Sequence, residues 1–183
     1  MTTAVALPGL STGTWAIDPT HSTVAFSVRH LMVSKVRGTF NTFSGQIEVA
    51  ADGTPAVTAE IGLDSFDTKN EQRDGHVRSA DFLEVEKYPT MTYRSTGLRA
   101  SGSDLVVEGE LTLHGVTKPV ELTVEYSGVN PGMGAGQVAG FEASTTINRG
   151  DFGITIQMPL EGGGVVIGEK ITITLDIEAV LQA

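Results

Sequence analysis

The sequence predicts an all-β protein, an antiparallel β-barrel of about eight strands. Apolar and polar residues alternate along most of the chain, and glycine-containing turn dipeptides separate the alternating runs. A period of two is typical of strands with one buried face and one face in water. Eight consecutive antiparallel strands also leave unpaired edges unless the sheet closes on itself. A barrel is therefore favoured, with a two-sheet sandwich as the alternative.

The alternating runs define the expected strands. Their approximate ranges are 22–32, 36–50, 55–64, 89–98, 104–114, 117–128, 136–148 and 169–181, after a short initial strand around Trp15–Ile17. Turns are expected at Asp52-Gly53, Ser101-Gly102 and His114-Gly115, because glycine adopts positive φ at little cost. Several glycines also fall within the strand patterns, where they predict bulges or bends at barrel corners: Gly38, Gly45, Gly62, Gly109 and Gly140.

Two segments break the alternation. Residues 68–83 (TKNEQRDGHVRSADFL) are compatible with a helix, and Asp67 or Thr68 is expected to cap it. Residues 149–168 contain three consecutive glycines, which predict a loop or hairpin. The sequence thus predicts one short helix and one irregular connection inserted into the barrel.

Length and charge limit the classes of protein. A chain of 183 residues suits one domain, which we assign to residues 13–183 after a flexible leader at 1–12. The net charge of -10 disfavours nucleic acid as a partner, and the absence of cysteine excludes disulfides. The first residues lack a basic start, and no apolar run approaches the length of a membrane span. We therefore expect a cytoplasmic protein with no permanent membrane insertion.

Catalytic motifs are weak in this sequence. The four histidines, His21, His30, His76 and His114, do not have the spacing of paired metal ligands, and no nucleophile motif surrounds a serine. A GxGxxA match at 134–139 precedes a strand pattern, whereas a phosphate-binding loop precedes a helix. The sequence therefore predicts no catalytic residue, no metal site and no enzyme.

The expected strands offer small inward side chains. The chain has only seven Phe, three Tyr and one Trp, while Ala, Val, Gly and Thr are frequent at strand positions. An eight-stranded barrel is either filled by its own side chains or holds one small ligand. Burying a hydrocarbon chain would contribute about 0.8 kcal/mol per methylene. A long apolar ligand and a filled core remain equal alternatives on composition alone.

Ionisable residues crowd the expected helix. They are Arg73, Asp74, His76 and Arg78. In one interpretation the two arginines pair with Asp67, Asp74 or Asp81. In the other they bind an anionic or polar head group at the barrel mouth, joined by Arg37 and Arg149, because the arginine fork suits phosphate oxygens.

Five stretches carry a resemblance to a known family. They are WAIDPTHSTVAFSVRHL (15–31), VRGTFNTFSGQI (36–47), DTKNEQRDGHVRSADFLEVEKYPTMTYRS (67–95), LTLHGVTKPVELTV (111–124) and INRGDFGI (147–154). With them the chain resembles the YceI-like family of polyisoprenoid-binding, lipocalin-like proteins. The resemblance implies an up-and-down barrel with its helix near the opening. It also implies a long-chain isoprenoid, isoprenoid quinone or other amphiphilic lipid in the lumen, for transport, storage or sequestration, and a possible homodimer.

The resemblance and the strand alternation together give candidate site residues. Those expected to line the hydrocarbon channel are Phe26, Val28, Phe40, Ile61, Leu63, Met91, Tyr93 and Phe141. Those expected near the head group are His30, Arg73, His76 and Arg78. Two alternatives remain open: a hydrolase or isomerase acting on a lipid in the same cavity, and a dimeric interaction domain without a ligand.

Overall fold

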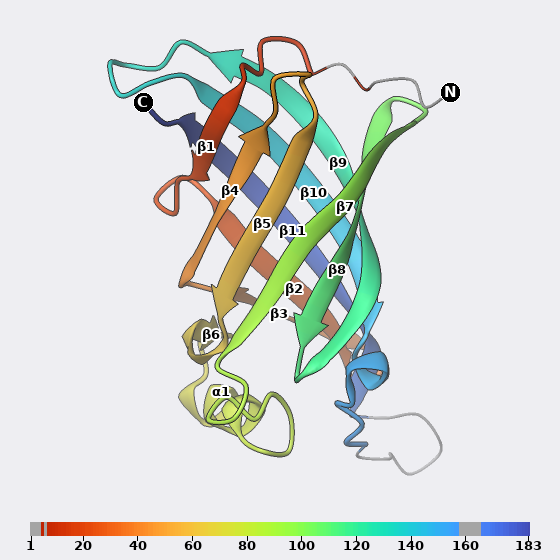
Figure 1. Ribbon diagram of the computed structural model, residues 1–183. Coiled ribbons are helices and arrows are strands. Elements are labelled where there is room, and N and C mark those ends of the chain that lie inside the picture. The colour runs from red at the N-terminus through yellow and green to blue at the C-terminus, as the bar shows by residue number, and fades with distance from the viewer. Residues whose placement is uncertain (1–4, 6, 158–165) are drawn as a thin grey trace.

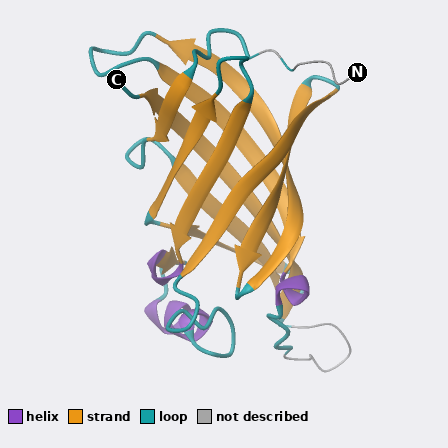
Figure 2. Ribbon diagram, in the orientation of Figure 1, coloured by secondary structure: helices purple, strands orange, loops and turns teal. Residues whose placement is uncertain are grey.

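The chain folds into a closed antiparallel barrel with one short helix at its lower end (Figure 1, Figure 2). The computed structural model describes residue 5, residues 7–157 and residues 166–183. The described strands are β1 (Gly13–Ile17), β2 (Thr23–His30), β3 (Ser34–Phe40), β4 (Phe43–Val49), β5 (Pro55–Gly62), β6 (Phe66–Asp67), β7 (Thr90–Ser101), β8 (Asp104–Leu113), β9 (Val116–Asn130), β10 (Val138–Asn148) and β11 (Ile167–Leu181). The predicted eight-stranded up-and-down barrel is confirmed.

The first and last strands close the barrel. The order β1-β4-β5-β7-β8-β9-β10-β11 returns to its start, because Trp15 of β1 lies opposite Leu181 of β11. Strand β2 continues in line with β1 and pairs with the first part of β11. The short initial strand is therefore an integral part of the wall.

The predicted strand at 36–50 is wrong as a single element. It divides at Asn41 and Thr42 into β3, which pairs with β2 and β6, and β4, which pairs with β1 and β5. Asn41 accounts for the break: its backbone N–H donates to the Ser65 carbonyl, and its side chain donates to the Asp67 carboxylate at 3.1 Å. The barrel wall is therefore interrupted at Asn41 and Thr42, next to the pairing of β3 with β6.

The three predicted turns are confirmed, and their glycines have positive φ: 84° at Gly53, 62° at Gly102 and 73° at Gly115. The register shifts between Gly140 and Phe141, so the bulge predicted there is confirmed. At Gly38 the reason is different, because a Cβ would overlap the Phe26 ring on the neighbouring strand. This glycine makes room for an aromatic side chain inside the barrel.

The helix is shorter than expected. Helix α1 spans Glu71–Arg78, and the Asn70 side chain caps it by accepting a hydrogen bond from the Arg73 backbone N–H at 2.9 Å. The predicted cap at Asp67 or Thr68 is wrong, because Asp67 ends β6 and Thr68 is bound to a buried carboxylate within the helix. A 3-10 turn, η1 (Leu63–Ser65), joins β5 to β6.

The second irregular segment begins with another 3-10 turn, η2 (Arg149–Phe152). The three glycines on which the loop or hairpin was predicted lie outside the described residues. Helix α1 and η2 both lie at the lower end of the barrel (Figure 2). In the part of the chain that the structure describes, none of the helices is both long and apolar enough to cross a bilayer.

Candidate functional site

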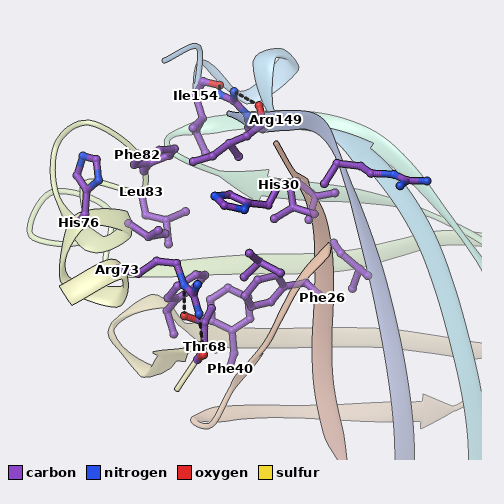
Figure 3. Close-up of a pocket in the computed structure, with 18 of the residues that line it drawn as sticks. Phe26, His30, Phe40, Thr68, Arg73, His76, Phe82, Leu83, Arg149 and Ile154 are labelled. Carbon is purple, nitrogen blue, oxygen red and sulfur yellow. Dashed lines mark hydrogen bonds between the residues drawn. The ribbon is translucent and has the colours of Figure 1, made fainter. Parts of the chain in front are cut away.

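A cavity of about 560 Å³ opens at the lower end of the barrel, beside α1 and η2 (Figure 3). Its apolar wall comes from the ends of the strands and from the segment after α1: Phe26, Val28, Val36, Phe40, Phe66, Val77, Phe82, Leu83, Met91, Leu113, Ile147, Ile154, Val166, Ile167, Ile171 and Ile173. Pockets for small molecules commonly measure about 300–1,000 Å³. The described barrel is therefore large enough inside to hold a ligand.

A second cavity of about 160 Å³ lies further along the lumen. Its wall is almost wholly apolar, with Ile61, Leu122 and Phe141 among its members. Met91 and Ile173 line both cavities. The two spaces are thus neighbouring chambers of one lumen, the lower wider than the upper.

Aromatic rings form one wall of the lower chamber. The ring centroids of Phe26 and Phe66 lie 5.0 Å apart, and Phe40 contacts both at 5.4 and 5.7 Å. These separations are typical of aromatic pairs, which contribute about 0.5–1.5 kcal/mol beyond their buried area. The cluster holds β2, β3 and β6 together at the chamber wall.

The ionisable residues of the lower chamber are all basic. Arg29, His30, Arg73, His76 and Arg149 line it, and no Asp or Glu is among its described lining residues. This contrasts with a chain in which 22 acidic residues face 12 Lys and Arg. Figure 3 shows His30 and Arg73 directed toward the cavity from opposite sides. Such a rim favours a ligand group with negative charge or hydrogen-bond acceptors.

Arg73 is held in place by Thr68. Its Nε donates to Thr68 Oγ1 at 2.7 Å, and its Nη2 donates to the Thr68 carbonyl at 3.0 Å. The buried Asp74 carboxylate in turn accepts hydrogen bonds from the Thr68 N–H and hydroxyl. This network fixes α1 against β6 and leaves Nη1 of Arg73 with no partner among the described residues. The interpretation in which Arg73 and Arg78 pair with Asp67, Asp74 or Asp81 is not supported among the described residues, where Asp67 pairs with Lys69 and Asp81 with His76.

Of the charged residues that the structure describes, Arg149 is the most deeply buried, at 4 % exposed. Its Nε, Nη1 and Nη2 donate to the carbonyls of Gly168, Ile154 and Ile167, at 3.0, 2.8 and 3.3 Å. No carboxylate pairs with it among the described residues, and burial lowers its pKa. Arg149 thus brings to the chamber wall a positive charge that backbone carbonyls, and no paired carboxylate among the described residues, stabilise.

The structure places the predicted site residues as follows. Phe26, Val28, Phe40, Met91, His30, Arg73 and His76 line the lower chamber, and Ile61, Met91, Tyr93 and Phe141 line the upper one. Leu63 is fully buried in η1 and lines neither chamber. Arg78 lines neither, because its guanidinium donates to the Phe66 carbonyl. The head-group role of His30, Arg73 and His76 remains a prediction.

Sequence reasoning missed part of the chamber. Phe66, Phe82 and Ile154 lie in or beside segments without alternation, so no periodic pattern marked their inward direction. Arg37, which was expected to join the basic group, is exposed and not among the chamber's lining residues.

Tyr93 of β7 is a buried phenol that lies against the wall of the upper chamber, over Gly109 of β8. Its hydroxyl donates to the Val120 carbonyl at 2.9 Å. Burial first, and the nearby Glu121 charge second, raise the pKa of Tyr93 to about 12. The residue is therefore a neutral hydrogen-bond donor at physiological pH.

A separate group of ionisable residues lies where β1 meets β2, and it comprises Asp18, His21 and Glu178. The His21 Nδ1 lies 2.7 Å from an Asp18 oxygen and 3.8 Å from Glu178. The hydrogen bond between Asp18 and His21 lowers the pKa of Asp18 and raises the pKa of His21. The side chain of His21 is 61 % exposed, so this group belongs to the outer surface and not to the lumen.

Fold and cavity define a class: a lipocalin-like closed barrel with an apolar lumen and a basic mouth. The model of the YceI-like domain matches residues 15–179, and the chain belongs to this family. A UPF0312 protein of Staphylococcus aureus is 38 % identical over 161 residues, covering 86 % of this chain and 91 % of that protein. A UPF0312 protein of Vibrio cholerae is 38 % identical over 139 residues, covering 74 % of each.

Solved structures share the fold. The YCEI protein of Campylobacter jejuni superposes with a TM-score of 0.71 at 26 % identity, covering 85 % of this chain and 90 % of that one. A polyisoprenoid binding domain from Saccharophagus degradans gives a TM-score of 0.67 at 20 % identity, covering 92 % and 98 %. BcnA of Burkholderia cenocepacia gives 0.73 at 22 % identity, covering 90 % and 99 %.

Proposed function

We propose that this protein binds one long-chain amphiphilic lipid, a polyisoprenoid or isoprenoid quinone, with its tail in the lumen and its head at the basic mouth. One observation carries the proposal: a wide chamber with a basic rim leads to a narrower chamber with an almost wholly apolar wall. The asymmetry matches a molecule with one polar end. The family and the neighbour described as a polyisoprenoid binding domain support the same ligand class.

The proposal assigns the head group to Arg73, His76 and His30. Arg73 has Nη1 available beyond its two bonds to Thr68, and His76 lies on the same helix face three residues later. The buried charge of Arg149 adds to the positive potential of the chamber. We propose that carriage, storage or sequestration of the lipid is the role, in the cytoplasm, and that no catalysis is involved.

The first test is extraction of the purified protein with organic solvent, followed by mass spectrometry of the lipids. We expect a co-purified isoprenoid or other long-chain amphiphile in near-stoichiometric amount. Repeated preparations without any lipid, together with no uptake of added isoprenoid, would refute the proposal.

The second test narrows the lumen. Ala59 lines the upper chamber, while Ala56 lies on the exposed face of the same strand, β5. Ala59→Phe should displace roughly two or three methylenes of the tail and weaken binding about tenfold or more. Ala56→Phe is the matched control and should leave affinity unchanged. Equal affinities for the two variants would contradict binding in the upper chamber.

The third test concerns the head. Arg73→Met should weaken a prenyl phosphate more than the prenyl alcohol of the same chain length, since only the phosphate draws on the positive charge. The control is Arg94→Met, because Arg94 pairs with Glu110 on the outer surface. His76→Ala and His30→Ala should lower affinity alone; a loss of lipid turnover in these variants would instead favour an enzyme.

A further inference from the structure

The tip of the β2–β3 hairpin exposes three consecutive apolar residues. Leu31, Met32 and Val33 are 41 %, 54 % and 81 % exposed. Scattered apolar residues are normal on protein surfaces, but a contiguous exposed apolar group is typical of a surface that contacts a partner. The tip adjoins the chamber mouth, because His30, directly before it, and Val36, three residues after Val33, both line the lower chamber.

The backbone of this tip indicates that the apolar residues are not there for the turn. Leu31 and Met32 have φ values of 51° and 63°, and the Val33 N–H donates to the His30 carbonyl at 3.2 Å. His30 pairs with Ser34, so the connection has three residues, and two successive residues with positive φ, as in a type I′ turn, strongly favour Asn and Gly. Large side chains in this conformation are strained. The sequence therefore keeps exposed apolar side chains at positions where local structure disfavours them.

The charge around the tip is equally unusual for this chain. Residues 19–47 contain no Asp or Glu, although the chain has 22 acidic residues. Arg29 and Lys35 are exposed and lie directly opposite each other across the hairpin, and Arg37 follows two residues later on the same face. Like charges in this position repel. None of the three forms an ion pair with any residue that the structure describes.

We infer that the β2–β3 hairpin docks the barrel mouth onto an anionic lipid surface. Leu31, Met32 and Val33 would enter the interfacial layer, while Arg29, Lys35 and Arg37 contact anionic head groups. Charge complementarity selects this occupant, because an anionic surface attracts the basic hairpin, whereas it repels the chain as a whole, whose net charge is -10. Docking would be reversible and would place the chamber opening at the bilayer. The inference goes beyond lipid binding in the lumen and is tested separately from it.

The test is co-sedimentation of the full chain with vesicles of mixed phosphatidylcholine and phosphatidylglycerol, and with pure phosphatidylcholine vesicles. We expect binding to the mixed vesicles that weakens in high salt, and little binding to the neutral ones. Val33→Glu and the double substitution Lys35→Glu/Arg37→Glu should each lower the partition coefficient about tenfold or more. Met133 is fully exposed in the loop between β9 and β10 at the other end of the barrel, so Met133→Glu is the matched control and should have no effect.

A second variant separates docking from folding. Leu31→Asn/Met32→Gly installs the dipeptide that the turn prefers, so its melting temperature should rise while vesicle binding falls. A lower melting temperature would show that the two side chains serve the fold and would overturn the inference. So would unchanged vesicle binding in these variants, an equal loss in Met133→Glu, or a loss confined to dimerisation, measured by light scattering. Uptake of isoprenoid from detergent solution, measured without vesicles, reports the lumen proposal independently.

Discussion

Replacing Arg149 by Met should destabilise the barrel by about 3 kcal/mol. The substitution removes three donors, each bound to a backbone carbonyl, from a side chain that is 4 % exposed. Hydrogen bonds to charged groups contribute about 1.5–3 kcal/mol each, but desolvating the guanidinium offsets several kcal/mol of that sum. The carbonyls left behind lose their partner, which costs about 1 kcal/mol apiece where water can enter from the chamber.

Urea unfolding followed by circular dichroism measures this change as a lower midpoint at unchanged slope. For a chain of this size the melting temperature should fall by roughly 6–12 °C. Arg94→Met is the control, because the exposed Arg94–Glu110 pair should contribute less than about 1 kcal/mol. If Arg149→Met lowered the free energy of unfolding by less than about 1 kcal/mol, no more than the control does, the view that its hydrogen bonds to three carbonyls stabilise the chamber wall would be refuted.

Two further predictions concern pH. Because burial raises the pKa of Tyr93 to about 12, the unfolded chain loses this proton first. Stability should be independent of Tyr93 below pH 10 and should fall by about 2–3 kcal/mol as pH rises from 10 toward 12. Denaturation of Tyr93→Phe across this range should lack that part of the slope; an identical slope would contradict the assignment. The His21 pKa is raised, so its contribution to stability is complete below pH 6.5 and is lost as pH rises through the folded-state pKa. Asp18→Asn should move the NMR titration of His21 to lower pH, and an unmoved titration would refute the pairing with Asp18.

The sequence predicted most of the barrel because strand alternation is a local signal. Phe26 and Val28 alternate with polar neighbours, and both face the chamber. The break at Asn41 was not predictable, since it depends on a hydrogen bond to Ser65, which is distant in sequence. Leu63 followed the alternation of β5 but lies in η1, where the period changes.

The basic mouth was predicted less completely. Arg73 and His76 are three residues apart and share one side of α1, whereas Arg78 is five residues from Arg73 and points elsewhere. Helical spacing alone could therefore have distinguished Arg73 and His76, which face the chamber, from Arg78, which does not. The burial of Arg149 could not be predicted from the sequence pattern, because its three partners are backbone carbonyls that only the tertiary fold brings together.

The pairing of β1 with β11 has a consequence for biosynthesis. Trp15 near the start of the chain meets its partner Leu181 only after β11 has left the ribosome. Until then β1, β2 and β10 lack their shared partner β11, so the growing sheet has open edges and an exposed apolar face. Pairing β1 with β11 also joins residues that are far apart in the sequence, so it has a large loop-closure entropy cost, and we expect it to form late in folding. Molecular chaperones that shield sheet edges should therefore matter most for this protein during its synthesis.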